Sequence, residues 1–105
     1  MKSVYIAQPI KGIPKDEVGA VRMGIISKLN EGLTVEDEYM LHEGDTYLEP
    51  GESELLHLGR AIMDISKVDY VVFAPGWEND PECQALWTVC NVYDLKWFEF
   101  DKVYL

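Results

Sequence analysis

Residues 69–93 of this chain read DYVVFAPGWENDPECQALWTVCNVY, a stretch that decides the fold class. It begins with an apolar run at residues 70–73 that is typical of a buried strand, and it ends in an amphipathic helix over residues 81–93. Asp80 is a suitable N-cap for this helix, and Pro81 suits its first position. A strand that leads into a helix brings free backbone N–H groups to one turn, where α/β proteins bind small ligands. The stretch therefore predicts part of a ligand site as well as a strand and a helix.

The remaining sequence alternates between strand-like and helix-like patterns. The predicted elements outside residues 69–93 are, in chain order, a strand at residues 4–7, a helix at 15–30, a short strand at 33–36, a helix that begins after Ser53, and one or two strands within 97–105. Ser53 is the predicted N-cap of the second helix, which carries one apolar stripe of Leu55, Leu58, Ile62 and Ile65.

This alternation predicts a single α/β domain over residues 1–105, built as a three-layer α/β/α sandwich with a mostly parallel, flavodoxin-like or Rossmann-like sheet. Residues 4–7 and 70–73 are apolar enough to be covered on both faces, which predicts that they are neighbouring inner strands. With 105 residues, the chain is long enough for one hydrophobic core and too short for two.

The formal net charge of −10 restricts the classes of partner. A polymeric nucleic acid requires a basic face on its protein, so we expect no such partner, whereas a single nucleotide in a local pocket is compatible with this charge. Residues 36–54 hold eight carboxylates and no Lys or Arg, and they are expected to form a solvated acidic loop. No apolar run approaches the roughly 20 residues of a membrane span, and residues 1–9 are too short for a signal peptide. We therefore expect a cytoplasmic protein without a membrane partner.

Cys83 and Cys90 fall on the same predicted helix. Seven helical residues rise about 10 Å, which exceeds the roughly 7 Å between Cα atoms that a disulfide allows. Both cysteines are expected to be reduced and to serve as small core residues. His42 has no metal-ligand spacing around it, and no P-loop, serine-triad or zinc pattern is present, so we expect neither a metal nor a cofactor.

Three segments, in order along the chain, share a pattern with one known group of proteins: VYIAQPIKG at residues 4–12, LGRAI at 58–62 with Asp69 after it, and FAPGWE at 73–78 with Cys83 and Tyr93 after it. Together they resemble the nucleoside 2-deoxyribosyltransferase-like superfamily, especially a small branch common in phages and prophages. The resemblance brackets nearly the whole chain and is weakest in the acidic segment. It implies a domain that binds a deoxynucleoside or nucleotide, and whose active members break the N-glycosidic bond and transfer the sugar to another base or to water. It also implies a homodimer or larger homo-oligomer, because such proteins often complete their pockets with a neighbouring subunit.

The resemblance further implies a nucleophilic glutamate one turn into the third helix, and the alignment from Gly76 places Leu86 there. A carboxylate at this point would trap or stabilise positive charge on the sugar, which leucine cannot do. Ala61 falls where relatives have Ser or Asp. Asp80 matches an acid that the transferases carry six residues before the nucleophile, so one carboxylate of the expected pair remains.

The candidate catalytic residues are therefore Asp80 and Glu82, and each has a simpler alternative role. Asp80 would also serve as a plain N-cap, and Glu82 would complement the helix dipole from the first turn. His57 shares a helical stripe with Arg60, Ala61 and Asp64, which we expect to be surface.

Most candidate ligand-binding residues lie at a predicted strand end or in a loop that follows a strand, and these are Tyr5, Gln8, Lys11, Gly76 and Trp77. Arg60, on the second predicted helix, is the remaining candidate. Trp77 could stack on a base, and Lys11 or Arg60 could meet a 5′-phosphate. The alternatives are a core tyrosine, a turn glutamine, a packed lid tryptophan and solvated cations. Gln8, Gly76, Trp77 and Asp80 are predicted to line one concavity.

Three functions follow from these observations. We favour a binding protein that retains a nucleoside or nucleotide pocket and has lost the nucleophile, for example a phage protein that sequesters a nucleotide. The second is an active deoxyribosyltransferase or deoxynucleoside-5′-monophosphate N-glycosidase that uses Asp80 or Glu82. The third is a structural homo-oligomer without a ligand.

Overall fold

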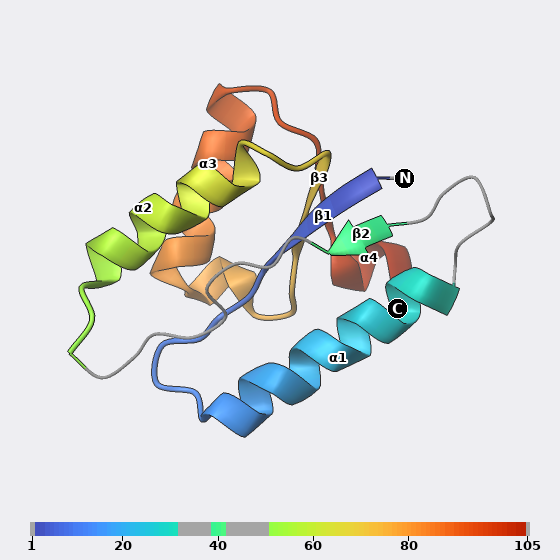
Figure 1. Cartoon of the computed structure of the whole chain (residues 1–105), viewed down its shortest axis with the longest axis horizontal. Helices are drawn as coiled ribbons and strands as arrows, with labels where there is room; N and C mark the ends of the chain where they lie inside the picture. Colours follow the sequence, from blue (N-terminus) through green and yellow to red (C-terminus); the bar gives the residue numbers. More distant parts are fainter. Residues whose placement is uncertain (1, 32–38, 42–50, 105) are drawn as a thin grey trace.

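The computed structural model describes residues 2–31, 39–41 and 51–104. In this part of the chain four parallel strands form one sheet in the order β2-β1-β3-β4. The elements are β1 (Lys2–Ala7), α1 (Lys15–Glu31), β2 (Tyr39–Leu41), α2 (Glu54–Ile65), β3 (Tyr70–Phe73), a 3-10 turn (Trp77–Asn79), α3 (Pro81–Val92), β4 (Trp97–Glu99) and α4 (Phe100–Tyr104). Helices α2 and α3 cover one face of the sheet, and α1 and α4 cover the other (Figure 1). The predicted three-layer α/β fold with a parallel sheet is confirmed.

The two central strands, β1 and β3, are adjacent as predicted. They pair in parallel, with Val4 opposite Tyr70 and Ala7 opposite Phe73. The side chains of residues 4–7 and 71–73 are almost fully buried because helices lie against both faces, and both Val4 and Phe73 are 0% exposed.

Side-chain alternation along these strands divides the core into two layers. Tyr5, Ala7 and Phe73 point towards α2 and α3, whereas Val4 and Ile6 point towards α1 and α4. The two groups of residues belong to separate hydrophobic clusters. The end of β1 can therefore present side chains to either helical layer.

Two elements differ from the predictions. Strand β2 lies within the acidic segment that was expected to be a loop, while the strand predicted at residues 33–36 falls outside the described residues, as do residues 42–50 of that segment. Residues 97–105 were predicted to form only strands, but β4 ends at Glu99 and α4 begins at Phe100. The reason for the second difference is packing, because the chain turns into a helix where the Phe100 side chain enters the core beneath α1, at 6% exposed.

The buried face of α2 is also different from the predicted stripe. His57, Ala61 and Ile65, spaced by four residues, are buried. Leu55 is 80% exposed and Ile62 is 37% exposed, so half of the predicted stripe faces outwards. The predicted surface position of His57 is wrong, since this side chain is 3% exposed.

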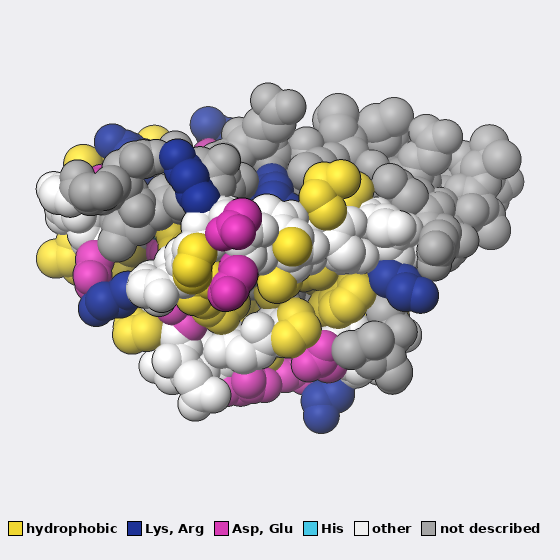
Figure 2. All heavy atoms as spheres, turned by 90° about the horizontal axis from the view of Figure 1, so that it is seen from below, with side chains coloured by type: hydrophobic (Ala, Val, Ile, Leu, Met, Phe, Trp, Pro, Cys, Tyr) yellow, Lys and Arg dark blue, Asp and Glu magenta, His cyan; other side chains and the backbone are white. Residues whose placement is uncertain are grey.

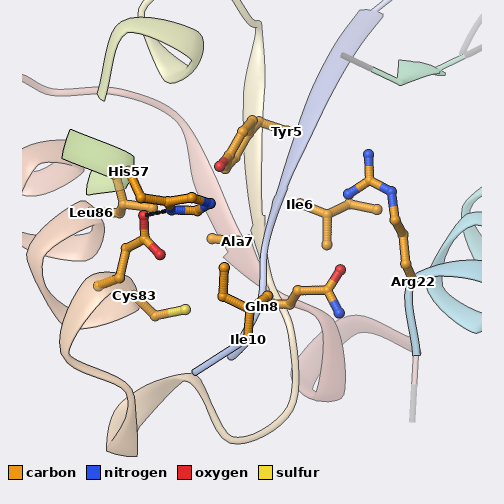
Figure 3. Close-up of a pocket in the computed structure, with 10 residues that line it drawn as sticks. Tyr5, Ile6, Ala7, Gln8, Ile10, Arg22, His57, Cys83 and Leu86 are labelled. Carbon is orange, nitrogen blue, oxygen red and sulfur yellow. Dashed lines mark hydrogen bonds and ion pairs between the residues drawn. The ribbon is translucent and has the colours of Figure 1, made fainter. Parts of the chain in front are cut away.

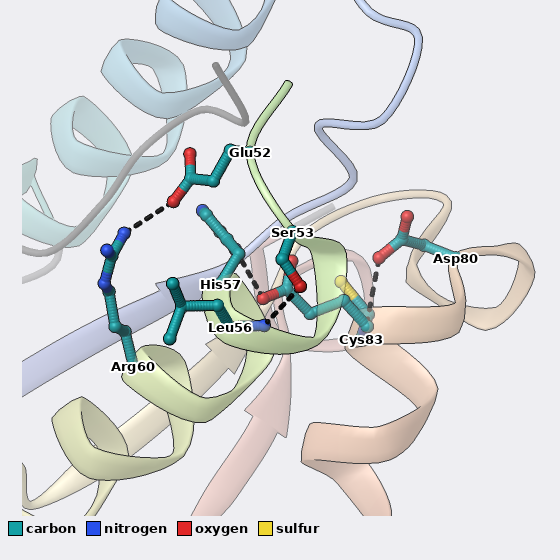
Figure 4. Close-up of polar contacts among 8 residues, drawn as sticks. Glu52, Ser53, Leu56, His57, Arg60, Asp80 and Cys83 are labelled. Carbon is teal, nitrogen blue, oxygen red and sulfur yellow. Dashed lines mark hydrogen bonds and ion pairs between the residues drawn. The ribbon is translucent and has the colours of Figure 1, made fainter. Parts of the chain in front are cut away.

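Both predicted N-caps are confirmed. The backbone N–H of Leu56 donates to Ser53 Oγ at 3.3 Å, and the backbone N–H of Cys83 donates to a carboxylate oxygen of Asp80 at 3.0 Å. Figure 4 shows these two caps on neighbouring helices. They fix where α2 and α3 begin, and both beginnings lie near the carboxyl end of β1.

The surface on the α1 side carries mixed charges. Figure 2 views this side from below, and on it the described Lys and Arg side chains lie scattered among acidic and apolar ones. Lys15, Asp16 and Glu17, in the first turn of α1, are all exposed. On the face shown, the described residues form no continuous basic patch.

We expect Asp80→Ala to lower the free energy of unfolding by about 1 kcal/mol, because the Cys83 N–H at the start of α3 loses its acceptor. Asp80→Asn should retain most of the stability, since an amide oxygen also caps a helix. Urea denaturation measures both. Glu78→Ala, at an exposed position of the same loop, is the matched control and should stay within about 0.5 kcal/mol of the unmodified protein. Equal losses for the alanine and asparagine variants of Asp80 would contradict a capping role.

Candidate functional site

Two adjoining cavities lie at the carboxyl end of β1, between the first turns of α2 and α3. We call them the inner cavity, of about 20 Å³, and the outer cavity, of about 150 Å³. They share Ile10, His57 and Glu82 in their walls. The inner cavity has room for roughly one water-sized group, and the outer cavity is comparable to cavities that bind a benzene-sized ring.

The end of β1 supplies the floor of the inner cavity. Tyr5 and Gln8 line this cavity, as the sequence predicted for a site at the first strand (Figure 3). Burial, followed by the negative charge of Glu82, raises the pKa of Tyr5, so its hydroxyl keeps its proton. Tyr5 is also a core residue, which was the alternative prediction for it. It is only 7% exposed and belongs to the hydrophobic cluster beneath α2 and α3.

A histidine–carboxylate pair connects the two helices at the site. His57 Nδ1 lies 2.7 Å from Glu82 Oε1, which joins α2 to α3. The His57 side chain is 3% exposed and that of Glu82 is 20% exposed. The sequence interpretation did not assign His57 to the site. Its four-residue spacing from Ala61 and Ile65 was the available signal, because it places the three side chains on one face of the helix.

Glu82 has an altered ionisation. Burial raises its pKa above the ordinary value, and the hydrogen bond and charge of His57 counteract part of that rise. The charges of Asp80 and Glu52 add to the increase. Glu82 is therefore more than a surface acid beside a helix dipole: it is a partly buried carboxylate that lines both cavities.

Two buried side-chain atoms, Gln8 Oε1 and His57 Nε2, have no hydrogen-bond partner among the described residues. The amide nitrogen of Gln8 is already used, because it donates to the carbonyl oxygen of Val18 at 3.1 Å. Leaving a polar atom buried and unpaired costs roughly 1–3 kcal/mol. Both residues line the inner cavity, so these atoms are available to a bound group.

The other candidate acid has a structural task. Asp80 lines the outer cavity and is 8% exposed, but one of its carboxylate oxygens accepts the Cys83 N–H. Leu86 is 1% exposed and lines the inner cavity. At the position where the resemblance implies a nucleophilic carboxylate, the chain thus presents an apolar side chain to the cavity.

The candidate phosphate-binding cations differ in position. Lys11 lines the outer cavity, where its ammonium nitrogen lies 3.0 Å from Glu54 Oε1. Arg60 lies outside both cavities, and its guanidinium is 2.5 Å from Glu52 Oε1 (Figure 4).

Gly76 and Trp77 line neither of these two cavities, Gln8 lines the inner one and Asp80 lines the outer one, so neither cavity brings the four residues together. Gly76 adopts a left-handed conformation, with φ of 84°, which turns the chain after β3. The indole N–H of Trp77 then donates to Glu99 Oε1 at 3.0 Å. This contact directs Trp77 towards β4.

The Trp77 ring belongs to an aromatic cluster. Its centroid lies 5.1 Å from that of Phe73 and 5.9 Å from that of Trp87, onto which it stacks. Trp97 contacts the same two neighbours of Trp77. These contacts agree with the alternative prediction that Trp77 is a packed aromatic residue. One face of its ring is covered by Trp87.

The two cysteines are free and buried, as predicted. Burial raises the pKa of Cys83 well above that of an exposed thiol and raises the pKa of Cys90 to about 11. A protonated thiol is a weak nucleophile, so Cys83 contributes packing to the inner cavity and not a reactive group.

Residues 2–31, 39–41 and 51–104 contain no group of three or more His, Cys, Asp or Glu side chains placed to hold a metal ion. None of their helices combines the length and apolar character needed to cross a membrane.

No protein-family model matches this chain, and comparisons with curated proteins and with solved structures gave no significant match. The resemblance carried by the three sequence segments stays a hypothesis.

We expect the free energy of unfolding to depend on pH through Glu82. Its pKa is higher in the folded than in the unfolded chain, so its contribution is most favourable below about 4.5 and declines as pH rises through the raised folded value. Glu82→Gln removes this titration. The stability of the unmodified protein relative to this variant should therefore decrease as pH rises from about 4, as measured by urea denaturation in a pH series. A difference that grows with pH would show that the hydrogen bond to His57 outweighs burial.

Proposed function

We propose that this chain is a nucleoside 2-deoxyribosyltransferase-like protein that binds a nucleoside or nucleotide in the outer cavity and does not cleave its glycosidic bond. The observation that carries the proposal is the composition of the two cavities: a buried His57–Glu82 pair faces them, while Leu86 stands where the resemblance implies the nucleophile.

The position of the site supports small-molecule binding. Parallel α/β sheets bind ligands beyond the carboxyl ends of their strands, where helix N-termini converge. Here β1 ends beside the capped first turns of α2 and α3. The outer cavity combines apolar walls from Ile10, Leu58 and Pro81 with the polar groups of His57 and Glu82. Such a mixture suits a flat heterocycle that needs both apolar contact and a few directed hydrogen bonds.

The carboxylates are poorly placed to act as nucleophiles. One oxygen of Asp80 is bound to the α3 backbone, and one oxygen of Glu82 is bound to His57. The raised pKa of Glu82 reflects a burial that disfavours its charged form. Without a free carboxylate at position 86, positive charge that develops on a sugar has no dedicated stabiliser, an effect typically worth several kcal/mol.

Charge in the outer cavity favours an uncharged nucleoside over a 5′-monophosphate. The described lining residues include one Lys, Lys11, and three carboxylates, those of Glu54, Asp80 and Glu82. Lys11 is already ion-paired with Glu54. A phosphate would have to displace that pair and enter a region of negative potential, which weakens its binding.

One observation favours a second candidate function. A carboxylate that is partly buried, has a raised pKa and is bound to histidine is common at catalytic sites. In this alternative the protein is an N-glycosidase or deoxyribosyltransferase in which Glu82 acts in a shifted position.

A homodimer or larger assembly remains part of the proposal. Helix α2 carries Leu55, Leu56 and Met63, which are 80%, 53% and 59% exposed. A second copy of the chain is one occupant that would remove this apolar surface from water.

The unmodified protein is expected to bind deoxynucleosides without releasing free base. Binding should raise the melting temperature in a thermal-shift series, and more so for nucleosides than for their 5′-monophosphates. Chromatography of the same mixtures after long incubation should show intact nucleoside. Turnover that disappears in both Glu82→Gln and Asp80→Asn would replace the binding proposal with the enzymatic one.

Leu86→Glu tests the missing carboxylate directly. We expect loss of stability of a few kcal/mol, because an acid would replace a side chain that is 1% exposed. Leu86→Gln has a similar shape without a charge and is the matched control. If the glutamate variant folds and releases base while the glutamine variant does not, a carboxylate at this position suffices for catalysis. Base release by both variants would show that position 86 is irrelevant to the chemistry.

A further inference from the structure

We infer that His57 determines ligand specificity: its Nε2 accepts a hydrogen bond, so the site selects a nucleoside whose base carries an exocyclic amino group. This inference rests on the proposed nucleoside binding and names the class of base.

The tautomer of His57 follows from its partner. When the Glu82 carboxylate is ionised it has no proton to donate, so the proton in its hydrogen bond of 2.7 Å with His57 lies on Nδ1. In the neutral ring, Nε2 is then an acceptor. This atom is buried and without a hydrogen-bond partner among the described residues. Figure 3 shows the imidazole beside Tyr5, in the wall of the inner cavity.

A second buried atom, Gln8 Oε1, is also a hydrogen-bond acceptor without a partner among the described residues. It is identified as the oxygen because the other terminal atom of the side chain, the amide nitrogen, donates to the Val18 carbonyl. Thus both unpaired buried side-chain atoms among the described residues of the inner cavity are acceptors. Only a group with N–H or O–H donors can satisfy them.

The donors nearby do not fill this role. Tyr5 and Arg22 line the inner cavity, but each has interactions of its own, and neither bonds to Nε2 or Oε1. The outer cavity adds the carboxylates of Glu54, Asp80 and Glu82, which are further acceptors. Hydrogen-bond acceptors therefore predominate among the polar side chains that line the outer cavity beside His57.

Size restricts which donor fits. The inner cavity, of about 20 Å³, accommodates one small group, and the outer cavity, of about 150 Å³, accommodates a ring. An amino group attached to a heterocycle matches this arrangement, with the ring in the outer cavity and the amino group directed at Nε2. A carbonyl oxygen in the same place would meet an acceptor and leave Nε2 unsatisfied.

The test compares nucleosides in which an oxo group replaces the amino group and the neighbouring ring nitrogen gains a proton: 2′-deoxyadenosine against 2′-deoxyinosine, and 2′-deoxycytidine against 2′-deoxyuridine. Isothermal titration calorimetry should show about tenfold tighter binding of the amino member of each pair, the effect of leaving buried acceptors unpaired. Equal affinities within the pairs, or tighter binding of the oxo members, would overturn the inference and leave the proposed function standing.

Two variants separate the hydrogen bond from general packing. His57→Phe keeps a ring of similar size and should reduce the tenfold preference to within about twofold. Glu82→Gln retains His57 but offers an amide N–H to Nδ1, which moves the proton to Nε2 and should weaken or invert the preference. Lys67→Gln, at an exposed position just after α2 and outside both cavities, is the matched control and should keep the preference of the unmodified protein. A preference that survives in both site variants would show that His57 does not set it.

A measurement without ligand distinguishes the inference from the proposed function. Nitrogen-15 NMR of the histidine side chains should show His57 protonated at Nδ1 only, and a proton on Nε2 would overturn the inference whatever binds. If none of the four nucleosides binds, the proposed function is wrong, and the inference about the base falls with it. The spectrum would then still report whether His57 presents an acceptor to the inner cavity.

Discussion

Strands β1 and β3 pair in parallel at the centre of the sheet, with helices against both faces. Because the two strands run in the same direction, their carboxyl ends lie together at one end of the sheet, and the chain must cross over between them. Alternation along β1 then sends Tyr5 towards α2 and α3, and sends Ile6 towards α1. Both cavities depend on this arrangement, since they surround the end of β1 and are closed by the first turns of α2 and α3.

The hydrogen bond between His57 and Glu82 joins α2 to α3 beside the end of β1. Burying a carboxylate is unfavourable, and the raised pKa of Glu82 reflects this cost. A fully apolar contact between α2 and α3 would avoid the cost, so the pair is a local departure from the best packing. Departures of this kind concentrate at functional sites, where a preset polar group is useful to a ligand. Leu86 has the opposite character: it stabilises the core and presents no charge to the inner cavity.

The site was only partly predictable from the sequence. Tyr5 and Gln8 follow from their place at the end of a predicted strand, and Glu82 from its place in the first turn of a predicted helix. His57 does not follow, because its helix has a second possible apolar face that includes Leu55 and Ile62. Only packing against the sheet decides between the two faces. Trp77 was misplaced for the same reason, since its orientation depends on Glu99, a residue 22 positions away.

Local chemistry in the sequence determined the elements themselves. Ser53, Asp80 and Pro81 mark where two helices begin, and the apolar run at residues 70–73 marks a buried strand, because capping and burial on both faces act over a few residues. The tertiary structure decided what depends on distant partners. Strand β2 exists by pairing with β1, and Phe100 ends β4 by entering the core beneath α1. The cavities likewise form only where the end of β1 and the first turns of α2 and α3 come together, so no single stretch of the sequence predicts them.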